Sequence, residues 1–238
     1  MFARLLHQQD ARRATEVVTE ILAHGLRCAL TGGLAIDAQL RARGRVAGPR
    51  GLNDIDLVVD GFASIPESLA GSFLQHHVHP DATDGRTLLQ LIDRPRAIRV
   101  DLFRALGHTL ARACPLDDET GVLPVLSIED LAARTTAVVC GSLRRGRPVD
   151  IKHAVSFGRL RGLGRSELLE AAWNDHRQQV PGTLDEASRE AERLLDAHPE
   201  LVIVEEYSAT ARPCERCREH GHFRPASPDT IAGILGYC

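Results

Sequence analysis

The stretch over residues 26–60, LRCALTGGLAIDAQLRARGRVAGPRGLNDIDLVVD, contains the pattern that decides the fold. Its first apolar run, 26–30, predicts a short buried strand, and the pair of glycines that follows breaks this strand. Residues 34–43 have the apolar spacing of a helix, and residues 54–60 predict a second strand. This order places a helix N-terminus, which can accept a phosphate group, close to a strand that carries two aspartates.

The remainder of the chain has two kinds of periodicity. Strand and helix patterns alternate up to about residue 122, and the pattern beyond it is helical. We therefore expect an α+β domain with a small mixed sheet over 1–122, a helical bundle over 123–207, and a Cys/His-containing tail over 208–238. The further expected helices are 10–24, 64–75, 127–139, 148–160, 165–178 and 184–196, and the further expected strands are 87–92 and 97–103.

The composition is that of a soluble globular protein, with 43% hydrophobic and 26% charged residues. There is no apolar run near 18 residues in length, so we expect no membrane span. The N-terminus lacks the pattern of a secretory signal peptide, which favours a cytoplasmic protein. A net charge of −3 argues against a uniformly basic surface for nucleic acid, although a local basic patch remains compatible with it.

Three aspartates form the candidate catalytic group. Side chains alternate between the faces of a strand, so Asp54 and Asp56 point the same way, and Asp101 lies within the later predicted strand over 97–103. An isolated Asp-x-Asp is more often a strand end that faces solvent, but Asp56 and Asp101 each have apolar neighbours on both sides. If the strands are adjacent, the three carboxylates repel one another unless a divalent cation binds, and oxygen ligands suit Mg²⁺.

The glycine pair, the Asp54-Ile55-Asp56 strand and the later Asp101, within residues 28–103, resemble the nucleotidyltransferase superfamily typified by DNA polymerase β. The resemblance implies transfer of a nucleoside monophosphate from a nucleoside triphosphate to a hydroxyl group. It also implies that the three aspartates are both catalytic residues and Mg²⁺ ligands.

The same resemblance assigns the triphosphate to the turn Thr31-Gly32-Gly33. About twenty residues separate this turn from Asp54, more than in compact members of the superfamily, and the insertion includes an arginine-rich loop over 41–50. Arginine suits phosphate binding because its planar fork matches phosphate oxygens. The candidates for neutralising the triphosphate are Arg41, Arg43, Arg45 and Arg50.

The segments SIEDL (127–131) and RPVDIKHA (147–154) resemble the helical region of AbiEii-type toxin nucleotidyltransferases and their antibiotic-modifying relatives. Thr135 and Val149 stand where those proteins have lysines. The resemblance implies that Asp150 and Lys152 bind nucleotide, and the alternative is a salt-bridged helix start. It further implies a toxin–antitoxin context, with an antitoxin as partner.

Two classes of molecule are candidates for the acceptor. RNA, such as the 3′ end of tRNA, is the acceptor implied by the toxin-type members, and a small-molecule antibiotic is the alternative. A non-catalytic protein that keeps the fold and binds a partner through its tail is a third interpretation.

The C-terminal tail contains a CxxC pair followed by histidines, which is half of a common zinc motif. A structural Zn²⁺ site is one interpretation, and free thiols or a disulfide are the others. The candidate zinc ligands are Cys214, Cys217, His220, His222 and Cys238.

Overall fold

The computed structural model describes residues 1–45, 48–78, 88–116, 123–177 and 179–204 of the 238-residue chain. The described residues divide into two compact units. The first lies within 1–105 and 115–125 and contains a β-sheet, and the second lies within 106–114 and 126–204 and is mainly helical.

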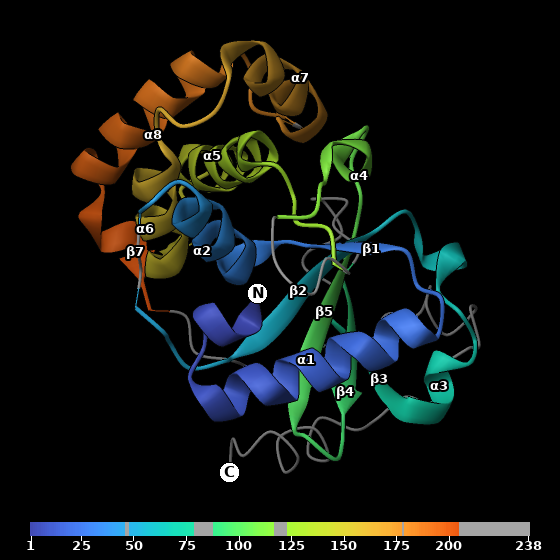
Figure 1. The fold of residues 1–238 in the computed structure, drawn as a ribbon. Coiled ribbons are helices and arrows are strands. Elements are labelled where there is room, and N and C mark those ends of the chain that lie inside the picture. Colours follow the sequence, from blue (N-terminus) through green and yellow to red (C-terminus); the bar gives the residue numbers. More distant parts are fainter. Residues whose placement is uncertain (46–47, 79–87, 117–122, 178, 205–238) are drawn as a thin grey trace. The chain divides into compact units, whose positions relative to one another are not determined.

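A five-stranded sheet forms the centre of the first unit (Figure 1). Its strands lie in the order β1-β2-β5-β4-β3; β2 and β5 are parallel and every other neighbouring pair is antiparallel. The sheet is therefore mixed, which together with the helical second unit confirms the expected α+β class. The strands are β1 (Cys28–Leu30), β2 (Asp54–Val59), β3 (Phe73–Val78), β4 (Leu88–Asp93) and β5 (Ile98–Arg104).

The longest helix of the first unit, α1 (Gln8–Ala23), lies along the sheet (Figure 1). Its apolar stripe is buried, and Arg96, in the turn between β4 and β5, donates hydrogen bonds to Glu16 and Glu20 of this helix. Helix α2 (Gly32–Ala42) follows β1 directly, as the sequence predicts, and packs against β2. Strand, turn and helix therefore bring the glycine pair to the edge of the aspartate-bearing strand.

The predicted helix over 64–75 is wrong. Residues Phe62–Ser64 form a 3-10 turn, helix α3 covers only Leu69–Ser72, and the chain is already in β3 from Phe73. The physical reason is the β3–β4 ladder, in which Phe73 lies opposite Asp93 and Val78 lies opposite Leu88. Pairing with a neighbouring strand overrides the local helical spacing of such a short segment.

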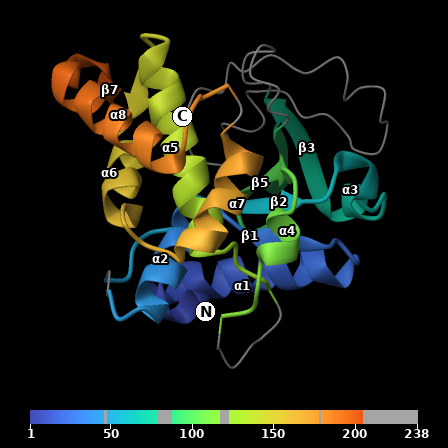
Figure 2. The same cartoon turned by 90° about the horizontal axis from the view of Figure 1, so that it is seen from above.

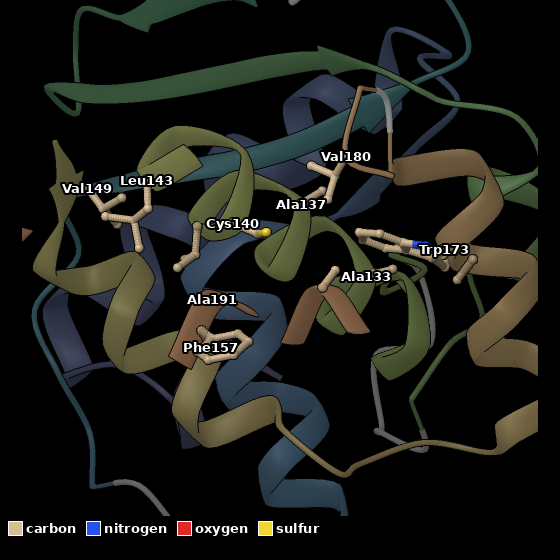
Figure 3. Packing of buried hydrophobic residues seen from close by; sticks show 12 residues of the cluster. Ala133, Ala137, Cys140, Leu143, Val149, Phe157, Trp173, Val180 and Ala191 are labelled. Carbon is tan, nitrogen blue, oxygen red and sulfur yellow. The ribbon is translucent and has the colours of Figure 1, made fainter. Parts of the chain in front are cut away.

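The second unit is built around α5 (Ile128–Arg144), which packs against three other helices (Figure 2). Buried side chains of these helices form its core, in which Trp173 is fully buried and donates from Nε1 to the Gly182 carbonyl at 2.8 Å (Figure 3). The predicted helix start at Ser127 is found, because its hydroxyl accepts a hydrogen bond from the Asp130 amide. The other elements are α4 (Thr109–Arg112), β6 (Val149–Asp150), α6 (Ile151–Leu160), α7 (Ser166–His176), α8 (Leu184–Ala197) and β7 (Val202–Ile203).

None of the helices in the described ranges is both long enough and apolar enough to cross a lipid bilayer.

Candidate metal and phosphate site

The parallel pairing of β2 and β5 brings the three predicted carboxylates together. Asp56 lies directly opposite Asp101 in the register, and Asp54 lies opposite Arg99. Each of the three aspartates offers one carboxylate oxygen, and these oxygens all lie within 4.8 Å of one another. Burial alternates over the first four residues of β2 as predicted, with Ile55 and Leu57 fully buried and both aspartates half-buried. The expected convergence of the carboxylates is therefore found.

A guanidinium group lies among these carboxylates. Arg99 forms an ion pair with Asp54, and its Nε lies 3.2 Å from Oδ1 of Asp101. The side chain of Asp101 is only 8% exposed, so water screens these charges poorly. One positive charge offsets part of the repulsion among three carboxylates, and the cluster keeps an excess of negative charge that a divalent cation can neutralise.

The glycine turn is fitted closely around Asp56. The Thr31 amide donates to the Asp56 carbonyl oxygen at 2.9 Å, and the Asp56 carboxylate occupies the space where a side chain at Gly32 would begin. Gly32 also has a φ of 66°, in the left-handed region that favours glycine. Two independent features, the left-handed φ and the lack of room for a side chain, therefore require glycine at this position.

Helix α2 begins at this turn, so its first amides and its positive dipole end lie beside the carboxylates. Of the four candidate arginines, Arg50 lies at the turn, with Nη2 2.9 Å from the position that a Cβ of Gly33 would take. Its Nε donates to Asp37 of α2 at 2.9 Å, which fixes the guanidinium there. Arg43, in contrast, donates back to Gln39 at the end of the same helix.

Two polar residues beside the carboxylates, Arg99 and Gln90, are absent from the sequence-based prediction. Arg99 is two residues before Asp101 on the same strand, so strand alternation alone could have placed it on the same face. Gln90 lies opposite Asp101 on β4, and only the register of the β4–β5 pair brings it there.

Asp150 and Lys152 belong to the second unit, where they form the start of α6. The Asp150 carboxylate accepts from the Lys152 amide at 2.9 Å, and Lys152 Nζ lies 3.2 Å from the same carboxylate. Asp150 is buried, whereas the Lys152 side chain is 66% exposed. These contacts are those of a helix N-cap, and nucleotide binding by the two residues stays a prediction.

The acidic residues of the SIEDL segment make internal contacts of the second unit. Glu129 accepts a hydrogen bond from the Arg165 amide at 2.9 Å. Asp130 is fully buried and accepts from His176 at 3.0 Å, from both Nε and Nη2 of Arg112, and from Ser127 at 2.6 Å. Burial raises the pKa of Asp130, but these hydrogen bonds outweigh it and hold the pKa at about 2. Asp130 thus acts as the ionised centre of a network that joins α4, α5 and α7.

The predicted zinc ligands lie outside the described residues, so the zinc interpretation stays a prediction. They are Cys214, Cys217, His220, His222 and Cys238.

Comparison with known proteins gives one structural similarity. The chain aligns with the crystal structure of an antigenic nucleotidyltransferase-like protein from Paracoccidioides brasiliensis at 14% sequence identity and a TM-score of 0.39, over 82% of this chain and 92% of that chain. No protein-family model matches the sequence, and no curated protein matches it. At this identity and TM-score the similarity says nothing about activity, which is therefore inferred from the geometry of the site.

Proposed function

We propose that the first unit is a Mg²⁺-dependent nucleotidyltransferase that moves a nucleoside monophosphate from a nucleoside triphosphate to a hydroxyl acceptor. The observation that carries this proposal is the cluster of Asp54, Asp56 and Asp101, whose ligand oxygens lie within 4.8 Å of one another against the Gly32 turn. Such a turn at a helix N-terminus binds phosphate, and a carboxylate cluster binds the cations that accompany phosphate.

The donor set fits Mg²⁺. All three side chains offer hard carboxylate oxygens, and the strand backbone of β2 and β5 fixes them through a continuous parallel ladder. The Asp56 carboxylate has its position defined on a second side by Gly32. When bound, Mg²⁺ would neutralise charge on the phosphates and lower the pKa of the acceptor hydroxyl.

The turn and the start of α2 are suited to hold the triphosphate. The amides of the first helical turn donate hydrogen bonds toward an anion at this end, and the helix dipole favours negative charge there. The guanidinium of Arg50 lies beside Gly33 and adds a charge-assisted donor. Its ion pair with Asp37 orients this donor before the substrate arrives.

Asp101 is the group that we assign to proton removal. It is the most buried of the three carboxylates, and it lies between Asp56 on one neighbouring strand and Gln90 on the other. The acceptor oxygen forms a bond to the α-phosphorus as its proton passes to Asp101. The bond from the α-phosphorus to the oxygen that bridges to the β-phosphate breaks, and pyrophosphate leaves with that electron pair.

RNA is the first proposed acceptor, in keeping with a toxin-type activity on the tRNA 3′ end and an antitoxin as partner. Arg50, at the end of the arginine-rich segment over 41–50, supplies positive charge beside Gly33 of the proposed triphosphate site. A small-molecule antibiotic is the second candidate, because the chain as a whole carries a net charge of −3 and lacks a general attraction for polyanions.

The test is transfer of label from α-labelled nucleoside triphosphates, with Mg²⁺ and with tRNA, aminoglycosides and lincosamides as acceptors. The wild-type protein should transfer label to one class of acceptor. Asp54→Ala and Asp56→Ala should each reduce the transfer rate at least about a thousandfold, because the bound metal ion no longer stabilises the charge of the transition state. Asp60→Ala is the matched control, because Asp60 follows the same strand and is exposed.

Labelling by Asp60→Ala should equal that of wild type. The proposal is overturned if wild type labels no acceptor and calorimetry detects no Mg²⁺-dependent nucleotide binding.

A further inference from the structure

Gln90 is a buried polar residue next to the carboxylate cluster that the proposed chemistry does not yet use. It lies in β4 directly opposite Asp101 of β5, and opposed residues of an antiparallel pair project to the same face of the sheet. The residue is only 3% exposed. Its side-chain oxygen Oε1 has no hydrogen-bond partner among the described residues.

A purely structural role does not account for this oxygen. Buried amide oxygens in folded proteins are nearly always satisfied, because a buried acceptor that lacks a donor destabilises the fold. Gln39, which is also buried, follows this rule, since its Oε1 accepts from Arg43 Nη1 at 2.6 Å. The Gln90 oxygen is therefore free to accept a hydrogen bond from a bound molecule.

The strand register gives the position of Gln90 relative to the parts of the site assigned to the triphosphate and to the acceptor. Asp56, Asp101 and Gln90 form one row across β2, β5 and β4, because each lies directly opposite the next. The Gly32 turn contacts this row at Asp56, which is the end assigned to the triphosphate. Gln90 lies on the far side of Asp101 from this turn, beside the carboxylate assigned to take the proton of the acceptor, and His76 of β3 follows it in the register.

We infer that Gln90 binds the acceptor, and that the acceptor carries a vicinal diol. One hydroxyl attacks and gives its proton to Asp101, while the neighbouring hydroxyl donates a hydrogen bond to Gln90 Oε1. A carboxamide has no charge, so it recognises a neutral hydroxyl beside the carboxylates without adding to their repulsion. This inference rests on the proposed nucleotidyl transfer. The terminal ribose of an RNA and a sugar ring of a small antibiotic both present such a diol.

The test compares acceptors that differ in one hydroxyl. The RNA probes are one oligonucleotide ending in a ribose 2′,3′-diol and the same oligonucleotide with a 2′-deoxy end. The small-molecule probes are kanamycin B and its 3′-deoxy form. Wild type should prefer the diol in one of the two pairs by about tenfold or more in kcat/KM, because a buried acceptor left without a donor penalises the deoxy analogue.

The variant Gln90→Met keeps the size of the side chain and removes the oxygen. Its preference for the diol should fall to near unity through a higher KM for the diol acceptor, with the KM for the nucleotide unchanged. The inference is overturned if wild type transfers label to both members of a pair equally, or if Gln90→Met keeps the wild-type preference. Transfer to none of the probes or panel acceptors overturns instead the proposed function on which the inference rests.

Thermal unfolding gives a readout that does not depend on activity. Gln90→Met removes an oxygen without a donor, so its Tm should be equal to or above that of wild type. Gln39→Met is the matched control, because it removes an oxygen that accepts a hydrogen bond from Arg43, and its Tm should be lower. A Tm for Gln90→Met as low as that of Gln39→Met indicates a structural bond at Gln90 and contradicts the inference.

Discussion

At the scale of single residues, the closest fit in the proposed site is that of Gly32 against Asp56. The glycine is in the left-handed region, and the carboxylate fills the place where a side chain would begin. The adjacent Thr31 amide binds the Asp56 carbonyl, so the turn contacts both the backbone and the side chain of this aspartate. A change at Gly32 is therefore transmitted directly to a proposed metal ligand.

Gly32→Ala should reduce transfer at least about a hundredfold, because its new methyl group displaces the Asp56 carboxylate and a shift of about 1 Å is enough for such a loss. Gly44→Ala is the matched control. Gly44 has a φ of 72° but no atom within 4 Å of the Cβ position, so it should cost about 1 kcal/mol of stability and leave the transfer rate unchanged. Rates at saturating nucleotide and urea unfolding measure the two effects. Equal rates for both variants would contradict the proposed role of the Gly32 fit.

The residues of the candidate site differ in how far sequence could predict them. Strand alternation placed Asp54 and Asp56 on one face, and the convergence with Asp101 followed once their strands were neighbours. Gln90 could not be found in this way, because its place depends on the register between β4 and β5. Single-residue patterns carry no information on which residue lies opposite another.

At the scale of elements, the network around Asp130 joins three helices of the second unit. Arg112 of α4 binds both Asp130 of α5 and Asp175 of α7, and His176 of α7 lies 3.0 Å from Asp130. Hydrogen bonds from Arg112 and from the His108 amide outweigh burial and lower the pKa of Asp175 as well. Short α4, which has one turn and little propensity of its own, is held in place by these contacts.

The network predicts a pH dependence of stability. Burial raises the pKa of Asp130, but the hydrogen bonds to its carboxylate outweigh burial and lower the pKa from an ordinary value of 3.8 to about 2. The folded state thus binds the proton more weakly than the unfolded state. The stabilisation from the Asp130 carboxylate is complete above about pH 4 and is lost as the pH falls toward 2; it is on the order of 2 kcal/mol.

The free energy of unfolding, measured in urea between pH 6 and about pH 2, tests this dependence. Asp130→Asn should lower stability at pH 6 and flatten the decline below about pH 4. Asp185→Asn, which changes an exposed carboxylate of α8, controls for the loss of one charge. An Asp130→Asn curve parallel to that of wild type through this range would exclude the proposed contribution.

Elements with strong periodicity were predictable, whereas several short ones were not. Helices α1 and α8 were found within two residues of their predicted limits, and α5 begins at its predicted N-cap but ends five residues later than predicted, because each has a long apolar stripe or an N-cap in the sequence. The two-residue β6 and β7 and the strand β3 were missed. These strands exist only through pairing with a distant partner, which local composition does not encode.

At the scale of the whole molecule, the chain divides into a sheet unit and a helical unit, and the segment 106–114 groups with the helices. This segment follows β5, the strand of Asp101, and its helix α4 is bound by Asp130 and Asp175. The α+β class was predictable because strand and helix periods change once along the chain. The grouping of 115–116 and 123–125 with the sheet unit was not predictable, since it depends on contacts such as the hydrogen bond from the Leu30 amide to the Pro124 carbonyl.

The central claim is that the three aspartates and the glycine turn form one cation–triphosphate site. Its most direct test is calorimetric titration of the full chain with α,β-non-hydrolysable analogues of the four nucleoside triphosphates, with and without Mg²⁺. Wild type should bind at least one analogue only when Mg²⁺ is present, Asp56→Asn should bind it at least about tenfold more weakly, and Asp60→Asn should bind it as wild type does. Absence of Mg²⁺-dependent binding in wild type, or unchanged affinity in Asp56→Asn, would contradict the claim.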